Sequence, residues 1–159
     1  MLFRSELLRS LAGGFGIALF LIYALMAVPL RSFLQPVLIM TAIPFGVVGA
    51  VAGHLITGYD LSILSMFGVI ALAGVVVNDN IVLVDWVNQR REHHDTLFEA
   101  VRTAGAARLR PILLTSLTTF GGLTPLLLEK SVQARFLVPM AVSLGFGVMF
   151  ATLISLVLV

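Results

Sequence analysis

Cysteine is absent from the 159 residues, so the chain can form neither a disulfide framework nor a thiolate metal site. Charge is also scarce: 11% of the residues are charged, less than half of the about 25% that is usual in soluble domains. A water-soluble core of this size would lack the polar surface to cover it. Hydrophobic residues make up 59% of the chain and the mean hydropathy is +1.07. The composition therefore predicts an integral membrane protein.

Catalytic motifs are missing as well. The sequence has no serine–histidine–acid arrangement, no phosphate loop and no nucleotide motif. The pair His93-His94 lacks nearby cysteine or acidic ligands at a suitable spacing and would make at best a weak metal site. The net charge is +2, but the basic excess lies in loops and therefore bears on membrane topology. We expect no enzyme activity, no cofactor, no metal centre and no nucleic-acid partner.

Five apolar stretches approach or exceed the ~20 residues that cross a bilayer. Between the third and fourth, Thr96 and Glu99 form a capping box, and apolar residues then recur at helical spacing. This pattern predicts a short amphipathic helix on the membrane surface at about 96–107. The fold class is thus all-α, a polytopic membrane protein with one transmembrane domain over 1–159. We place the five transmembrane helices at about 8–28, 33–57, 62–89, 111–129 and 135–159.

The polar connection from Gln89 to Arg110 carries five of the ten Lys and Arg residues. By the positive-inside rule it is expected in the cytoplasm. Alternation of the helices then puts Met1 outside. A chain that starts outside without a signal and stops without polar anchors is expected to be a fragment of a longer protein.

Asp79 lies well inside the third predicted helix. An aspartate at the centre of a membrane helix costs about 2.5–3.5 kcal/mol on insertion scales, so it pairs, faces water or takes up a proton. Each outcome makes Asp79 a candidate for proton coupling; the alternative is a structural aspartate bonded to a neighbouring helix. Asn78 shares a helix face with Ala71 and Gly74. It is a second relay candidate, or a hydrogen-bonding group between helices.

Four further residues are weaker candidates. Asp85 stands near the cytoplasmic end, where it is expected to be an interfacial charge that pairs with Gln89 or Arg90. Thr115 and Thr119 share one face of a hydroxyl-rich helix and can relay protons, or can simply bond back to the carbonyl four residues earlier. Arg108 stands just before Pro111, where it is expected to be a snorkelling anchor unless it has a functional role.

Two motifs resemble those of a known family. The stretch Gly74–Asp85, GVVVNDNIVLVD, is similar to the central membrane motif of the resistance-nodulation-division (RND) superfamily, and Arg108–Ser116, RLRPILLTS, is similar to its next motif. The likeness covers essentially the whole chain and is strongest to the hydrophobe/amphiphile multidrug efflux branch. In that family each protomer has two homologous membrane halves, each with a large periplasmic domain inserted after its first helix. The chain resembles the five helices that follow such an insertion.

The resemblance implies a membrane fragment of a proton-driven efflux antiporter in the bacterial inner membrane. Asp79, Asn78, Thr115 and Arg108 would be its proton relay, Asp85 and Thr119 secondary sites, and protons the coupling ion. We favour the C-terminal half, since first halves usually carry two adjacent acids where Asn78 precedes Asp79. Known C-terminal halves carry lysine at that position, so Asp79 is alternatively expected to face the acids of the missing half directly.

Implied partners are the lipid bilayer, the missing N-terminal half and the periplasmic domains of the same pump. The resemblance also implies a homotrimer with a periplasmic adaptor and an outer-membrane channel. Two alternatives stay open. One is a related superfamily member that exports lipids, proteins or metal ions. The other is a structural membrane subunit in which Asp79 only fixes helix packing.

Overall fold

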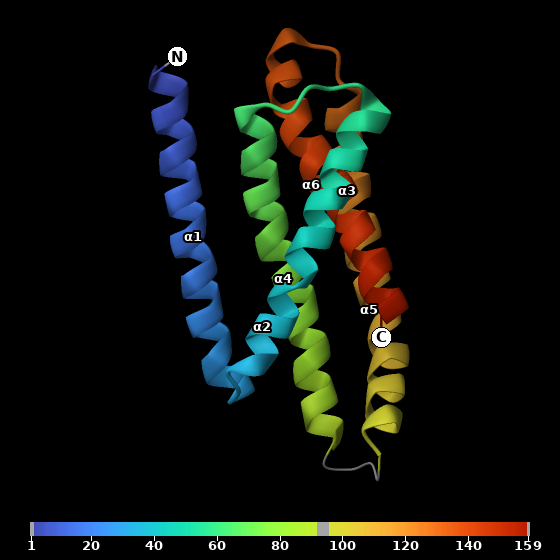
Figure 1. Cartoon of the computed structure of the whole chain (residues 1–159). Coiled ribbons are helices and arrows are strands. Elements are labelled where there is room, and N and C mark those ends of the chain that lie inside the picture. The colour runs from blue at the N-terminus through green and yellow to red at the C-terminus, as the bar shows by residue number, and fades with distance from the viewer. Residues whose placement is uncertain (1, 92–95, 159) are drawn as a thin grey trace. The chain divides into compact units, whose positions relative to one another are not determined.

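The computed structural model describes residues 2–91 and 96–158, and all regular structure in these ranges is α-helical (Figure 1). Five segments are long and apolar enough to cross a membrane, which confirms the predicted class of fold. The helices are α1 (Leu2–Leu30), α2 (Leu34–Met40), α3 (Ala42–Thr57), α4 (Ile63–Arg91), α5 (Leu97–Leu128) and α6 (Val132–Leu158).

The chain forms two compact units, residues 1–40 and residues 41–159. In the first unit, α1 stops where Arg31 adopts a left-handed backbone conformation with φ of 46°. The Ser32 hydroxyl then accepts hydrogen bonds from the backbone N–H groups of Leu34 and Gln35, which caps the start of α2. Tyr23 donates its hydroxyl to the carbonyl of Phe33 at 3.2 Å and so ties α1 to this turn.

The second predicted helix, 33–57, is interrupted at Thr41, between the end of α2 and the start of α3. The cause is Pro44. Proline has no amide hydrogen to donate to the carbonyl of Met40, four residues earlier, and its ring crowds that carbonyl. The whole segment Leu34–Thr57 still has the length and hydropathy of one membrane span.

The predicted surface helix at 96–107 and the predicted span at 111–129 are one continuous helix, α5. Its start agrees with the predicted cap, because the Thr96 side chain accepts a hydrogen bond from the backbone N–H of Glu99 at 3.3 Å. Pro111 lies inside α5 without ending it. No glycine or asparagine in a left-handed conformation stands before it, and membrane helices tolerate proline when neighbouring groups satisfy the freed carbonyl. The connection between α4 and α5 is therefore much shorter than the predicted 89–110.

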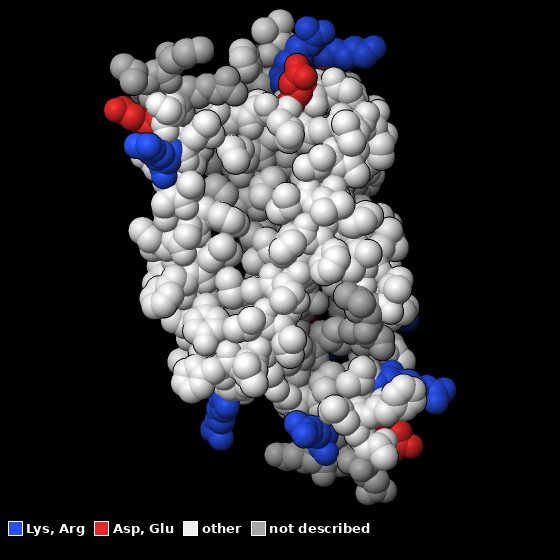
Figure 2. Space-filling view, in the orientation of Figure 1, with Lys and Arg blue, Asp and Glu red and all other residues white. Residues whose placement is uncertain are grey.

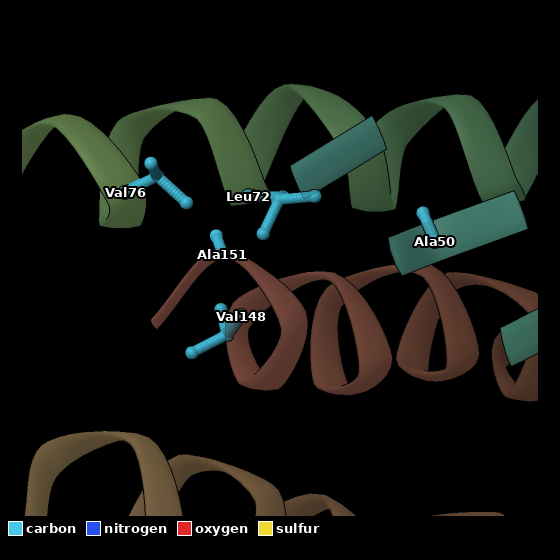
Figure 3. Packing of buried hydrophobic residues seen from close by; sticks show 5 residues of the cluster. All are labelled: Ala50, Leu72, Val76, Val148 and Ala151. Carbon is cyan, nitrogen blue, oxygen red and sulfur yellow. The ribbon is translucent and has the colours of Figure 1, made fainter. Parts of the chain in front are cut away.

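In the second unit α6 packs against α3, α4 and α5. Its core cluster draws on three of these helices: Ala50 from α3, Leu72 and Val76 from α4, and Val148 and Ala151 from α6 (Figure 3). All five side chains are buried. Helix α6 is thus the element around which the other three are arranged.

Small residues, Gly49 and Gly53, let α3 and α6 approach closely along a packing seam. A Cβ added at Gly53 would lie 2.5 Å from the Cβ of Phe146, and one at Gly49 would collide with Phe150. Since lipid supplies no hydrophobic force between helices, such close van der Waals contact is a main source of helix association in membranes.

The ends of the helices in this unit fall into two groups. The α3–α4 and α5–α6 connections lie at one end, and the end of α4 and the start of α5 lie at the other (Figure 1). Charged side chains gather near helix ends on the face shown in Figure 2, and the surface between them is white. This distribution is the one a membrane-spanning bundle requires.

Candidate functional site

Asp79 lies near the middle of α4 and is half-buried. It lines a small cavity between α4, α5 and α6 with a volume of about 10 Å³, which is room for about one water molecule. Among the described residues the carboxylate makes no hydrogen bond. The other lining residues are Val76 and Asn80 from α4, Ile112 from α5, and Val148, Ala151, Thr152 and Ser155 from α6.

A pair of buried hydroxyls stands at this cavity. The Ser116 Oγ of α5 and the Thr152 Oγ1 of α6 are 2.6 Å apart, and the two residues are 1% and 7% exposed. Thr152 also lines the cavity that Asp79 lines, as does Ser155 one turn further along α6. The polar residues that line the cavity with Asp79 are thus its neighbour Asn80 and the hydroxyl residues Thr152 and Ser155 of α6, and Ser116 of α5 is linked to them through its bond with Thr152.

The structure places Asn78 and Thr115 outside that cavity. Both are exposed on the surface of the second unit. The Thr115 hydroxyl donates to the carbonyl of Pro111 at 2.9 Å, the back-bonding arrangement that is common in membrane helices. Thr119, one turn further along α5, is half-buried. Asn80 faces the cavity, and its amide donates to the carbonyl of Val76 at 2.8 Å.

Arg108 and Asp85 lie toward the end where α4 stops and α5 begins. The Arg108 guanidinium lies over the ring of Trp86, with 5.5 Å between its central carbon and the ring centroid, a cation–π contact that joins α5 to α4. Its Nε–H is buried and has no hydrogen-bond partner among the described residues. Asp85 accepts a hydrogen bond from the side-chain amide of Gln89 at 2.8 Å, one of the two predicted pairings.

One of the three histidines, His54, is buried in α3. Its Nδ1 is 2.9 Å from the carbonyl of Ala50, and its Nε2 is 2.8 Å from the Ser65 hydroxyl of α4. Both ring nitrogens therefore have partners. His93 and His94 lie outside the described residues, and no group of three or more His, Cys, Asp or Glu suited to a metal occurs among the described ones.

Three of the residues around Asp79 escape the sequence analysis. Ser116 is one of six Ser and Thr residues in α5, and nothing in the spacing selects it over Thr115. Thr152 and Ser155 are the only hydroxyl residues besides Ser143 in the apolar stretch of α6. Polar residues in a membrane helix usually face the bundle interior. The scarcity of hydroxyl residues in α6 is therefore the signal that could have identified Thr152 and Ser155.

A multi-pass helical membrane protein with an acidic side chain facing the interior of its bundle is a candidate for the class of transporters. Comparison with known proteins makes the class definite. The model of the AcrB/AcrD/AcrF family matches residues 5–159. The chain belongs to this family of RND transporters, as its two sequence motifs indicate.

Individual relatives are similar over nearly all of this chain. The swarming motility protein SwrC of Bacillus subtilis is 33% identical over 143 residues, which are 89% of this chain and 14% of that protein. The cobalt-zinc-cadmium resistance protein CzcA of Cupriavidus metallidurans is 31% identical over 140 residues, 88% of this chain and 13% of CzcA. A crystal structure of a heavy metal efflux pump superposes with a TM-score of 0.75 at 30% identity and covers 90% of this chain and 14% of the pump. The chain thus spans about 14% of the relatives' length.

Proposed function

We propose that this chain is part of the membrane domain of a proton-driven efflux antiporter, in which the Asp79 carboxylate binds and releases the coupling proton. The observation that carries the proposal is the position of Asp79, half-buried in a membrane helix and facing a small cavity among α4, α5 and α6. A carboxylate placed there is costly when charged and unpaired, so its protonation state and the packing of the three helices depend on each other.

Helix α6 gives that dependence a mechanical route. It packs against α3, α4 and α5, and its residues Val148 and Ala151 line the cavity and also belong to the core cluster (Figure 3). When a proton neutralises Asp79, the requirement for polar contacts at the cavity falls and the helices can close on it. When the proton leaves, α4 and α6 must admit water or a polar partner. Such a two-state packing change is how a proton drives a conformational cycle.

The exposed polar side chains support a larger assembly. Asn78 and Thr115 face away from the second unit, and polar groups in membrane helices rarely face lipid. We infer that the other half of the transporter, which this chain does not include, covers them. Asn78, Thr115 and Arg108, with Asp85 and Thr119 as secondary sites, then remain relay residues whose partners come from that half. By the same resemblance this chain is the C-terminal half.

The cargo is one of two classes. The sequence motifs favour drugs and other amphiphiles, whereas the likeness to CzcA and to a heavy metal efflux pump favours divalent metal ions. Recognition of either cargo by periplasmic domains would leave the membrane site the same.

The proposed membrane and topology rest on the family resemblance and on the basic residues of the connection between α4 and α5. We propose a bacterial inner-membrane protein whose α4–α5 connection is cytoplasmic and whose α3–α4 and α5–α6 connections face the periplasm, and a single membrane domain that holds both units. The trimer, the periplasmic adaptor and the outer-membrane channel are proposed on family resemblance alone.

The test is Asp79→Asn in the full-length transporter, expressed in a host without its own efflux pumps. We expect susceptibility to the cargo, tried as a panel of drugs and as cobalt, zinc and cadmium salts, to return to that of cells without the transporter. Asp60→Asn, the same change in the exposed α3–α4 connection, is the matched control and should leave resistance intact. Full resistance of Asp79→Asn at normal expression refutes the proposal, and a purely structural Asp79 would lower expression instead.

A further inference from the structure

The hydroxyl groups at the Asp79 cavity can do more than fill space, provided that the proposed proton coupling holds. Ser116 and Thr152 are both buried, come from different helices and lie 2.6 Å apart. Thr152 and Ser155 are on one side of α6, three residues apart, and both line the cavity. Two hydroxyl residues, Thr152 and Ser155, thus line the cavity with the Asp79 carboxyl group and Asn80, and Ser116 supports Thr152 from α5, while the other lining side chains are apolar.

A hydroxyl pair has a property that an amide or an ion pair lacks, because either oxygen can donate to the other. If Ser116 donates to Thr152, the Thr152 hydrogen is free to point into the cavity. If Thr152 donates to Ser116, Thr152 presents only a lone pair there. Rotation of two O–H bonds therefore converts the group that faces Asp79 from a donor into an acceptor.

The two orientations match the two states of the carboxyl group. An ionised carboxylate only accepts hydrogen bonds, whereas a protonated one also donates. The cavity, at about 10 Å³, has room for about one water molecule. A water held there by Thr152 and Ser155 would have the two to four polar partners that a buried water needs.

We propose that Ser116, Thr152 and Ser155 form a water-holding site that orients one water against Asp79 and reverses its hydrogen bonds as Asp79 gains or loses its proton. In the release step the O–H bond of the Asp79 carboxyl breaks and an O–H bond to the water forms. The water passes one of its own hydrogens to the Ser155 oxygen, and Ser155 releases its own hydrogen to water outside the cavity, so that the cavity water and Ser155 stay neutral and Asp79 is left ionised. Thr152 then donates toward the cavity and stabilises the carboxylate. Thr152 and Ser116 are positioning residues in this scheme, because they act through the water.

The test uses the full-length transporter in proteoliposomes, with proton movement followed by a pH-sensitive dye on either side of the membrane. Thr152→Val keeps the shape of the side chain and removes its hydroxyl, and Thr152→Ser keeps the hydroxyl. We expect Thr152→Val to slow proton flux about tenfold and to change its pH profile, and Thr152→Ser to restore both. Thr124→Val is the control, because within the part of the chain that the structure describes the Thr124 hydroxyl bonds to the carbonyl of Phe120 in its own helix, at 2.9 Å, and to no other group.

A second readout does not depend on turnover. Infrared difference spectra with labelled aspartate should show the carboxyl band of protonated Asp79, identified by its loss in Asp79→Asn, shifted in Thr152→Val and unshifted in Thr124→Val. If Thr152→Val behaves as Thr124→Val in flux, pH profile and spectrum, while Asp79→Asn abolishes flux, the water site is refuted and the proposed function stands. If Asp79→Asn keeps full flux, the proposed function itself fails.

Discussion

At the scale of single residues, the His54 ring shows how buried polar groups are satisfied in this bundle. A carbonyl can only accept, so Nδ1 carries the hydrogen that goes to Ala50. In the neutral ring Nε2 then accepts from the Ser65 hydroxyl, whose oxygen also accepts from the backbone N–H of Ser62 at 3.1 Å. The chain of bonds joins α3 to the start of α4 through one histidine, and it leaves no ring nitrogen for a metal or ligand.

A double-mutant cycle measures this bond. We expect His54→Leu and Ser65→Ala each to lower the free energy of unfolding in mixed detergent. The double variant should lose less than the sum of the two, with a coupling of about 0.6 kcal/mol and at most about 1.7 kcal/mol, the range known for hydrogen bonds between membrane helices. Additive losses, within the ~0.3 kcal/mol expected of independent sites, would show that the two side chains do not interact.

The sequence singles out the residues whose chemistry is unusual for a membrane helix. It does not determine the direction in which each side chain points. Asp79 stands out because an acid in an apolar run is costly wherever it faces. Thr115 and Ser116 are adjacent, and consecutive helical residues differ by about 100° around the axis. Which of them meets α6 depends on the rotation of α5, and that rotation is set by packing over its whole length. The spacing therefore favoured Thr115, whereas in the structure Ser116 contacts Thr152 of α6, a residue that lines the cavity.

At the scale of elements, the seam between α3 and α6 limits what either helix can carry. We expect Gly53→Ala to destabilise the transporter by about 1–3 kcal/mol, the usual cost of overpacking, because the added Cβ would lie 2.5 Å from the Cβ of Phe146. Equilibrium unfolding in detergent is the measurement. Phe146→Ala in the same molecule removes the opposing ring and should recover part of that loss of unfolding free energy. A double variant that loses more unfolding free energy than the sum of the two single variants would contradict the close contact between Gly53 and Phe146.

The helices themselves could be predicted to different degrees. The existence of five spans follows from length and hydropathy, which depend on composition alone, and the structure confirms it. The break at Thr41 and the fusion of two predicted helices into α5 depend on proline. Pro44 and Pro111 have the same covalent chemistry, yet the helix is interrupted at Thr41, shortly before Pro44, whereas α5 continues through Pro111. The difference lies in what surrounds each freed carbonyl, which a single sequence does not contain.

At the scale of the whole molecule, the second unit has two kinds of face. One side of α4 and α5 packs on α6 and holds the Asp79 cavity. Elsewhere on α4 and α5, Asn78 and Thr115 are exposed, and a Cβ added at Gly74 or Gly122 would meet no described atom within 4 Å. A lipid-facing surface would be expected to be uniformly apolar. The relative SwrC extends far beyond the 14% of its length that matches this chain, and under the proposed function the corresponding part of the transporter would cover these residues.

Spin labels can show whether protein or lipid covers that face, and the lack of cysteine in the chain means that no other position within it reacts. We expect a nitroxide at Asn78→Cys, in the full-length transporter in vesicles, to be shielded from both dissolved oxygen and a water-soluble paramagnetic reagent, because another helix packs on it. A label at Asp60→Cys, in the exposed α3–α4 connection, should be open to the water-soluble reagent. A lipid-borne nitroxide of matched depth provides the oxygen reference. Oxygen access at position 78 equal to that reference would mean that Asn78 faces lipid, and the relay would then have no partner on that side.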